Sequence, residues 1–491
     1  MAASLGSTAA RGALMTLGGQ GGRILLQFLG IVVLARLLDP EDYGLLAVVT
    51  VIIGVGEIFR DFGLSSAAVR AKTLSHGESS NLFWINSGIG ALLGLILIAI
   101  SPLVADAVGR EEVQGIAQAM SLVFLLNGLA TQFRAHLMRS LRFRQLATVD
   151  VCAPALALAV AVGGALLGWG YWALVAQQIT QALVVLVGAA LVGSWRPGRP
   201  RRDVSVRSFL RFGTGLVGSQ LVNYGTNNVD TAIVGVVHGA TDLGLYNRAY
   251  QLVITPLAQV QAPVTSVAVP VLSKIQDEQA RFGAYLLRGQ LALGYPISLV
   301  LALVAVEAEN IVALMLGEKW LAAVPLLQLF ALAGIARNLA YVGYWVYVVR
   351  GLSRSLFRYS LLTGAVRVLC VAIGASFGVV GVAAGLAIAP WIAWPISLAW
   401  LSRVTTVPTR GLYAGALRII AVAVLAGGTG FGLSLALPAL PAVLEIALVG
   451  LMMLLVAAAL CLLPAFRRDV RDLRDVARLV RDRRSRRSDP A

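Results

Sequence analysis

A set of polar side chains interrupts the first apolar segment of this chain. Gln20, Arg23 and Gln27 are spaced by three and four residues, so they share one face of a helix. An arginine within an apolar segment is costly unless it meets water or a partner, and its planar guanidinium suits a phosphate group. These residues predict an anion-binding cavity. The alternative is an ion pair from Arg23 to Glu57 or Asp61 in the second segment.

Three further arginines lie within apolar segments and are candidates for lining the same cavity. Arg337 shares a helix face with two tyrosines, and Arg367 shares one with small hydroxyl residues. Arg248 begins the eighth segment, where its long side chain could instead extend to the outer interface. The pattern predicts a cationic cavity and leaves that alternative open for Arg248.

Carboxylates in the apolar segments are candidates for ion coupling. Burial favours the neutral form of a carboxyl, so Glu57, Asp61 and Asp230 could each take up and release a proton, or bind sodium. Asp61 could instead lie at the membrane interface, so Glu57 and Asp230 are the better candidates. We expect coupling to a proton or sodium gradient and no other cofactor. The few histidines and cysteines are isolated from one another, so neither a metal site nor a disulfide is expected.

The elements that must hold these groups are membrane helices. The 491 residues are 58% hydrophobic and only 13% charged, which excludes an ordinary soluble enzyme. At roughly 20 apolar residues per crossing, we expect an all-α integral membrane protein of about fourteen transmembrane helices. The predicted spans are 14–37, 43–64, 82–104, 113–134, 148–168, 171–194, 212–236, 244–272, 285–305, 321–348, 360–376, 379–402, 413–436 and 443–464.

The basic residues predict the orientation. With the N-terminus inside, most of the 40 Lys and Arg residues fall on the inner side, as expected for a multi-pass protein of the cytoplasmic membrane with both termini cytoplasmic. This distribution accounts for the net charge of +16 without nucleic-acid binding. The basic tail, 466–491, suits a helix on anionic membrane lipids, and a solvated tail is equally compatible with it.

A weak internal repeat divides the chain. Shifted by 200 residues, Asp42 and Gly44 coincide with Asp242 and Gly244. The same shift places Gln20, Arg23 and Gln27 on Gln220, Asn223 and Asn227, which makes Asn223 and Asn227 cavity candidates. We expect two six-helix lobes related by a parallel pseudo-repeat, with two extra C-terminal helices, although chance identities remain the alternative. The predicted domains are 1–195 (N-lobe), 196–211 (basic cytoplasmic linker), 212–403 (C-lobe), 404–465 (last two spans) and 466–491 (tail).

Several short motifs resemble a known family. They include LARLLDP at 34–40, DFGL at 61–64, FWIN at 83–86, GYWALV at 170–175, GLYNRAY at 244–250 and PVLSK at 270–274. Their order along residues 10–400 resembles the bacterial Wzx-type polysaccharide flippases of the multidrug/oligosaccharidyl-lipid/polysaccharide exporter superfamily, in particular the exporters of colanic or teichuronic acid units.

The resemblance implies a transporter and not an enzyme. Such a protein flips an undecaprenyl-pyrophosphate-linked oligosaccharide to the outer face by alternating access, with cationic cavity residues on the pyrophosphate. Arg23 fits that role, whereas its repeat counterpart Asn223 is neutral. The expected partners are the lipid-linked oligosaccharide, anionic membrane lipids, and the polymerase and assembly proteins of polysaccharide biosynthesis.

Two other functions remain open. A membrane glycosyltransferase or polymerase could use Asp39, Glu41 and Asp42 of the first outer loop as catalytic carboxylates, but that loop is short. A lipid II flippase or a drug antiporter of the same superfamily would share the fold and differ in the lining of the cavity.

Overall fold

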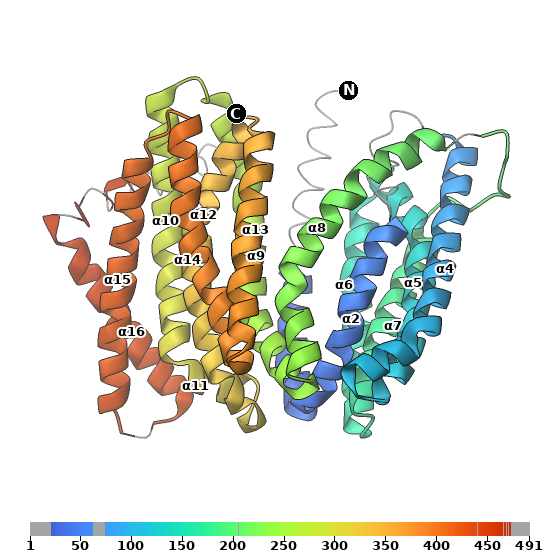
Figure 1. The fold of residues 1–491 in the computed structure, drawn as a ribbon, viewed down its shortest axis with the longest axis horizontal. Helices are drawn as coiled ribbons and strands as arrows, with labels where there is room; N and C mark the ends of the chain where they lie inside the picture. The colour runs from blue at the N-terminus through green and yellow to red at the C-terminus, as the bar shows by residue number, and fades with distance from the viewer. Residues whose placement is uncertain are drawn as a thin grey trace, which may run out of the picture. The chain divides into compact units, whose positions relative to one another are not determined.

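The computed structural model describes residues 21–61, 74–204, 206–438, 440–464, 466–467, 469 and 471–472, and these are almost entirely helical. Each predicted span contains a helix (Figure 1). Residues 21–37 are helical. The other long helices are α2 (Pro40–Asp61), α4 (His76–Val108), α5 (Glu112–Arg139), α6 (Phe143–Leu166), α7 (Tyr171–Val192), α8 (Arg207–Val237), α9 (Ala240–Lys274), α10 (Gln279–Val306), α12 (Val324–Val349), α13 (Ser353–Ala375), α14 (Gly378–Val404), α15 (Thr409–Ala436) and α16 (Ala442–Cys461).

The lengths and apolar compositions of these helices make this a multi-pass membrane protein. Twelve helical segments among the described residues are long and apolar enough to cross a membrane. The helix at 21–37 and α8, which has 31 residues, occupy the other two predicted spans. The sequence did not predict the short helices α11 (Ala308–Met315) and η1 (Glu318–Ala323), which connect α10 to α12.

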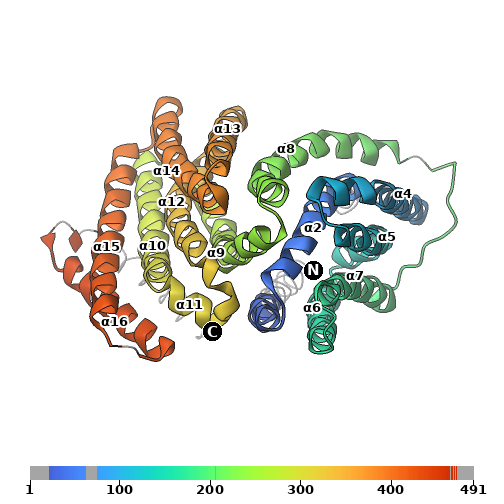
Figure 2. The same ribbon diagram turned by 60° about the horizontal axis from the view of Figure 1, so that its bottom comes forward.

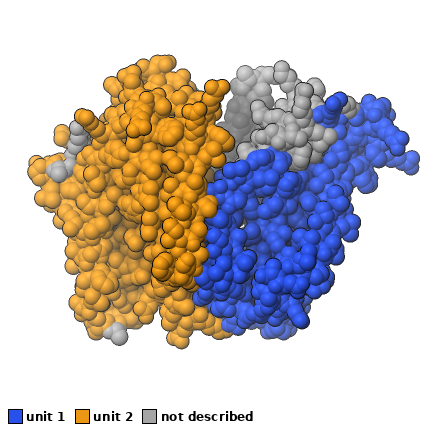
Figure 3. All heavy atoms as spheres, in the orientation of Figure 1, with its two compact units in different colours: residues 1–247 blue, residues 248–491 orange. Residues whose placement is uncertain are grey.

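The described contacts divide the chain into two compact units, residues 1–247 and 248–491 (Figure 3). Unit 1 contains α2 to α8 and the start of α9, because α8 packs along α2. The Tyr224 hydroxyl of α8 donates to the Val51 carbonyl of α2 at 3.0 Å. The predicted linker 196–211 therefore lies within unit 1, and the predicted domain boundaries remain predictions.

Small residues let the helices of unit 1 approach closely. In α4, a Cβ on Gly90 would lie 2.5 Å from the carbonyl oxygen of Phe124 in α5. In return, a Cβ on Gly128 of α5 would lie 2.7 Å from the carbonyl oxygen of Asn86. Close backbone approach at small residues is typical of membrane helices, whose association gains little from the hydrophobic effect. The helices α4 and α5 therefore pack closely at these two glycines.

The segment between α7 and α8 is fastened to the start of α4 (Figure 2). The buried Asn81 side chain accepts from the Arg201 backbone N–H at 2.7 Å and donates to the carbonyl oxygens of Arg201 and Val204. Trp195 is buried against Phe83 and Phe133. The sequence predicted a linker here, and its backbone is held in place by these bonds.

The repeat-related glycines meet in unit 1. A Cβ on Gly44 of α2 would overlap the carbonyl group of Ala240 at the start of α9. A Cβ on Gly244 would overlap the carbonyl group of Pro40. Positions 40 and 44 thus contact 240 and 244 reciprocally, which is the contact that a two-fold relation between repeats produces. This reciprocity supports the predicted parallel repeat.

Unit 2 is built from α10, α12 and α14 to α16, with α13 packed on α14. The described residues after α16 turn back onto this unit. Phe466 is buried against Val422 and Ala457, and Asp469, which is 2% exposed, accepts from Arg418 Nε and Nη2 at 2.7 and 2.8 Å. The start of the tail is therefore docked on unit 2, whereas residues 473–491 lie outside the described residues.

Candidate functional site

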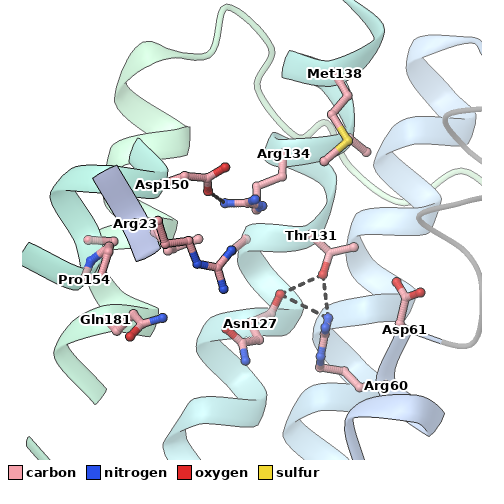
Figure 4. A pocket seen from close by; sticks show the side chains of 14 residues that line it. Arg23, Arg60, Asp61, Asn127, Thr131, Arg134, Met138, Asp150, Pro154 and Gln181 are labelled. Atoms are coloured by element: carbon pink, nitrogen blue, oxygen red, sulfur yellow. Dashed lines mark hydrogen bonds and ion pairs between the residues drawn. The ribbon is translucent and has the colours of Figure 1, made fainter. Parts of the chain in front are cut away.

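A polar pocket of about 680 Å³ lies within unit 1. Its charged lining side chains come from four helices, namely the helix at 21–37, α2, α5 and α6 (Figure 4). We call it the arginine pocket. Its polar lining residues are Arg23, Arg60, Asp61, Asn127, Thr131, Arg134, Asp150 and Gln181.

Arg60 is fixed by a network that joins α2 to α5. Its Nε donates to Glu57 Oε2 at 2.7 Å, and its Nη2 lies 2.7 Å from the same oxygen. Its Nη1 donates to Thr131 Oγ1 at 2.5 Å and to the Asn127 carbonyl oxygen at 3.2 Å. The side chain of Arg60 is 11% exposed, and all three of its nitrogens are engaged. This arginine joins two helices and has little capacity left for a ligand.

Arg134 is paired more simply. Its Nη1 donates to Asp150 Oδ1 at 2.7 Å, which links α5 to α6. The two side chains are 27% and 29% exposed, so the pair borders the pocket. A guanidinium has five N–H donors. Among the described residues, Asp150 is the one partner of Arg134, which leaves most of its donors available.

Arg23 and Asp61 line the pocket without such partners. Arg23 points into the space between Arg134, Asn127 and Gln181 (Figure 4). Neither Arg23 nor Asp61 makes a hydrogen bond or ion pair to any residue that the structure describes. The alternative pairing of Arg23 with Glu57 or Asp61 is thus absent from the described contacts, because Glu57 pairs with Arg60. Arg23 is the most available cation in the pocket.

Other predicted residues of unit 1 lie elsewhere. Gln27 is exposed on the same helix as Arg23, and Gln20 lies outside the described residues. On α8, the Asn227 amide donates to Asn223 Oδ1 at 2.9 Å, as their spacing of four residues predicts. Asp230 is 1% exposed and accepts from the Tyr246 hydroxyl at 2.6 Å, a bond between α8 and α9. None of the four described ones lines the arginine pocket; these are Gln27, Asn223, Asn227 and Asp230.

Three predicted arginines belong to unit 2 and to three different helices. Arg248 lies in the N-terminal third of α9 and donates from Nη1 to Gln251 Oε1 at 2.9 Å. Arg337 is on α12 and Arg367 is on α13, and both are partly buried. Their participation in substrate binding stays a prediction.

Arg134 and Arg60 were not predicted as pocket residues, because both fall among the basic residues assigned to the inner side of the membrane. Both α2 and α5 extend as helix through these basic positions. One signal in the sequence was available. Glu57 and Arg60 are spaced by three residues, which predicts a pair on one helix face.

Comparison with known proteins identifies the relatives of this chain. A family described as "Polysaccharide biosynthesis protein" matches residues 33–325. The lipopolysaccharide biosynthesis protein WzxC of Escherichia coli K12 is 30% identical over 327 residues, covering 64% of this chain and 65% of WzxC. The teichuronic acid biosynthesis protein TuaB of Bacillus subtilis 168 is 32% identical over 294 residues, covering 58% of this chain and 59% of TuaB. The matched part spans less than two thirds of either relative.

A solved structure shares the fold over nearly the whole length. The lipid II flippase MurJ in an inward closed conformation matches with a TM-score of 0.69, covering 92% of this chain and 99% of that one. At 15% identity, this likeness concerns the fold alone. The resemblance found in the sequence motifs is confirmed by these comparisons.

Proposed function

This chain belongs to the polysaccharide biosynthesis protein family, and on that premise we propose that it is a flippase for a lipid-linked oligosaccharide. The substrate is an undecaprenyl-pyrophosphate-linked repeat unit, which moves from the cytoplasmic to the outer face of the membrane by alternating access. The names of WzxC and TuaB, which refer to lipopolysaccharide and teichuronic acid biosynthesis, support a polysaccharide precursor as the cargo.

One observation carries the proposal. Arg23 is an unpaired cation, among the described contacts, in a polar pocket of a membrane protein. The side chain of Arg23 is exposed, and an exposed charge within a membrane-spanning unit needs water or a ligand of opposite charge. A diphosphate group matches the guanidinium by charge and by its paired oxygens. The amide of Gln181, which has no described partner, is available nearby for a sugar hydroxyl.

The position of the pocket supports loading from the cytoplasm. Arg134 and Asp150 flank the connection between α5 and α6. Three basic residues lie in this connection or at the helix ends beside it, namely Arg139, Arg142 and Arg144. Basic connections are typical of the cytoplasmic side. We place both termini on that side, with the pocket in the inner half of the membrane.

Asp61 is the strongest of the three candidates for ion coupling. Glu57 accepts from Arg60 and Asn127, and Asp230 accepts from Tyr246, so both of these carboxylates already have structural partners. Asp61 lines the pocket without a described partner. Protonation of this carboxyl would change the charge of the pocket during a transport cycle.

The glycosyltransferase alternative receives little support from the first outer loop. Glu41 is ion-paired with Arg110, whose other partner is Glu112. These two acids raise the pKa of Arg110. The Asp42 carboxylate accepts from the Asp39 backbone N–H at 3.0 Å at the start of α2. Glu41 is thus engaged by Arg110, and Asp42 caps the start of α2.

The test uses the purified full-length protein in liposomes. A fluorescent oligosaccharide is presented on undecaprenyl pyrophosphate, on undecaprenyl monophosphate, or as lipid II, and its transfer between leaflets is measured. We expect transfer of the diphosphate-linked repeat unit to exceed that of the other two. If no transfer occurs and new glycosidic bonds form when donor and acceptor are supplied, the protein is a glycosyltransferase and the proposal is wrong.

A further inference from the structure

The three arginines of the pocket differ in how firmly they are held. Arg60 has four described contacts, Arg134 has one, and Arg23 has none. We propose that Asp150 is an exchangeable internal counter-ion that occupies Arg134 in the empty pocket and is displaced from it by the diphosphate of the substrate. This inference rests on the proposed function and adds a residue that sets the affinity of the same site.

The charges of the empty pocket are balanced. Glu57 neutralises Arg60 and Asp150 neutralises Arg134, while Arg23 and Asp61 carry opposite charges. A diphosphate that links a lipid to a sugar carries about two negative charges, and Arg23 alone supplies one positive charge. A second cation would balance the diphosphate, and the other cations among the described lining residues are the two ion-paired arginines, Arg60 and Arg134.

The geometry selects Arg134 as that cation. Its pair with Asp150 has one short contact at 2.7 Å, borders the pocket and is more than a quarter exposed on both sides. Such a partly exposed pair is worth only ~1 kcal/mol, or about fivefold in an equilibrium constant. A phosphate oxygen can therefore replace the Asp150 carboxylate on Arg134 at small cost. The donors of Arg134 that Asp150 does not use can bind a second oxygen.

Arg60 cannot be exchanged in the same way. Releasing Glu57 would still leave Arg60 bound to Thr131 Oγ1 and to the Asn127 carbonyl. The same release would break the bond from the Asn127 amide to Glu57 Oε1 at 3.1 Å. Arg60 thus stays in its network between α2 and α5. Glu57 is a structural partner of Arg60, whereas Asp150 is an exchangeable partner of Arg134.

Replacing the carboxylate of Asp150 or of Glu57 by an amide distinguishes the exchangeable partner from the structural one. Asp150→Asn keeps the shape of the side chain and removes the charge with which the phosphate competes. Binding of inorganic pyrophosphate to the purified full-length protein is measured by calorimetry at fixed low salt. We expect Asp150→Asn to tighten binding about fivefold, the value of the lost pair. Arg134→Gln is expected to weaken it.

Three controls make the result specific. Asp106→Asn, an exposed site at the end of α4, should leave the affinity unchanged. Glu57→Gln should give no tightening, because Arg60 keeps its contacts to Asn127 and Thr131. In an Arg134→Gln background, Asp150→Asn should have no effect, since the interaction energy of the pair is then absent.

The outcomes distinguish this inference from the proposed function. If the wild type binds pyrophosphate in a way that depends on Arg23, but Asp150→Asn binds equally well or more weakly, Asp150 is a structural partner and the exchange is wrong. Tightening that persists in the Arg134→Gln background would also overturn it, because the effect would then be a general change of charge. If the wild type does not bind pyrophosphate at all, both the inference and the phosphate-binding role of Arg23 are wrong.

Discussion

The reciprocal contact between α2 and α9 gives a quantitative prediction for Gly44→Ala. In an ordinary helix this change is favourable by about 0.5–1 kcal/mol, because alanine loses less entropy on folding than glycine does. Here the added methyl group would overlap the Ala240 carbonyl and lie 2.8 Å from Ala240 Cα. Ordinary van der Waals contact begins at 3.4 Å, and the carbonyl oxygen and carbon of Ala240 would lie closer to the added methyl group than its Cα does, so the two backbones must separate by well over ~0.6 Å.

The backbone atoms at this contact cannot rotate away as a flexible side chain could. Overpacking of this kind typically costs about 1–3 kcal/mol, and backbone contact places Gly44→Ala near the upper end. After subtracting the gain in helix propensity, we expect a net destabilisation of ~2 kcal/mol. For a unit the size of unit 1, this corresponds to a decrease in Tm of about 4–8 °C.

The assay is thermal unfolding of the purified protein in detergent at one scan rate, since such transitions depend on the rate. Gly88→Ala in α4 is the matched control, because nothing lies within 4 Å of its added Cβ. We expect the control to match or exceed the wild-type Tm. A Gly44→Ala variant as stable as the Gly88→Ala control would refute the argument from close backbone contact.

Three further predictions concern stability. Asn81→Ala removes three hydrogen bonds to the segment before α8 and should lower stability by about 1–3 kcal/mol, measured as a loss of Tm. An unchanged Tm would mean that the contacts of Trp195 and Gly198 are sufficient to hold the segment. Asp469→Asn should lower Tm more than Asp472→Asn, since Asp469 is the more deeply buried of the two and accepts two bonds from its arginine; equal losses would contradict this ranking. Burial raises the pKa of Glu307, which lies between α10 and α11, above its ordinary value of 4.5, so stability should fall as pH rises from 4.5 through the folded-state pKa. Glu307→Gln should reduce the fall of Tm with pH over this range. An unaltered slope would mean that other titratable groups cause the fall.

The fold was largely predictable because membrane insertion imposes long apolar segments. Each predicted span contains a helix, and the shift of 200 residues aligned Gly44 with Gly244, two positions that the structure places in contact. The short helices α11 and η1 were missed, since brief helices after a span have no strong periodicity of their own.

The candidate site was predictable only in part. Arg23 was identified because a charge in an apolar segment is conspicuous. Arg134 and Asp150 were not placed together, because each lies near a helix end, where charges are common. Their pairing depends on α5 and α6 meeting in space, which periodicity does not show. The docking of Asp469 on Arg418 was missed for the same reason, within a tail that composition describes as basic and polar.

The central claim is that Arg23 recognises a diphosphate-linked oligosaccharide during transfer across the membrane. The most direct measurement compares the wild type with Arg23→Gln and Arg23→Lys in liposomes that contain the fluorescent undecaprenyl-pyrophosphate-linked repeat unit, at matched amounts of folded protein. We predict transfer by the wild type, nearly complete loss in Arg23→Gln and partial activity in Arg23→Lys, which keeps the charge but not the paired donors. Transfer by Arg23→Gln at the wild-type rate would contradict the account.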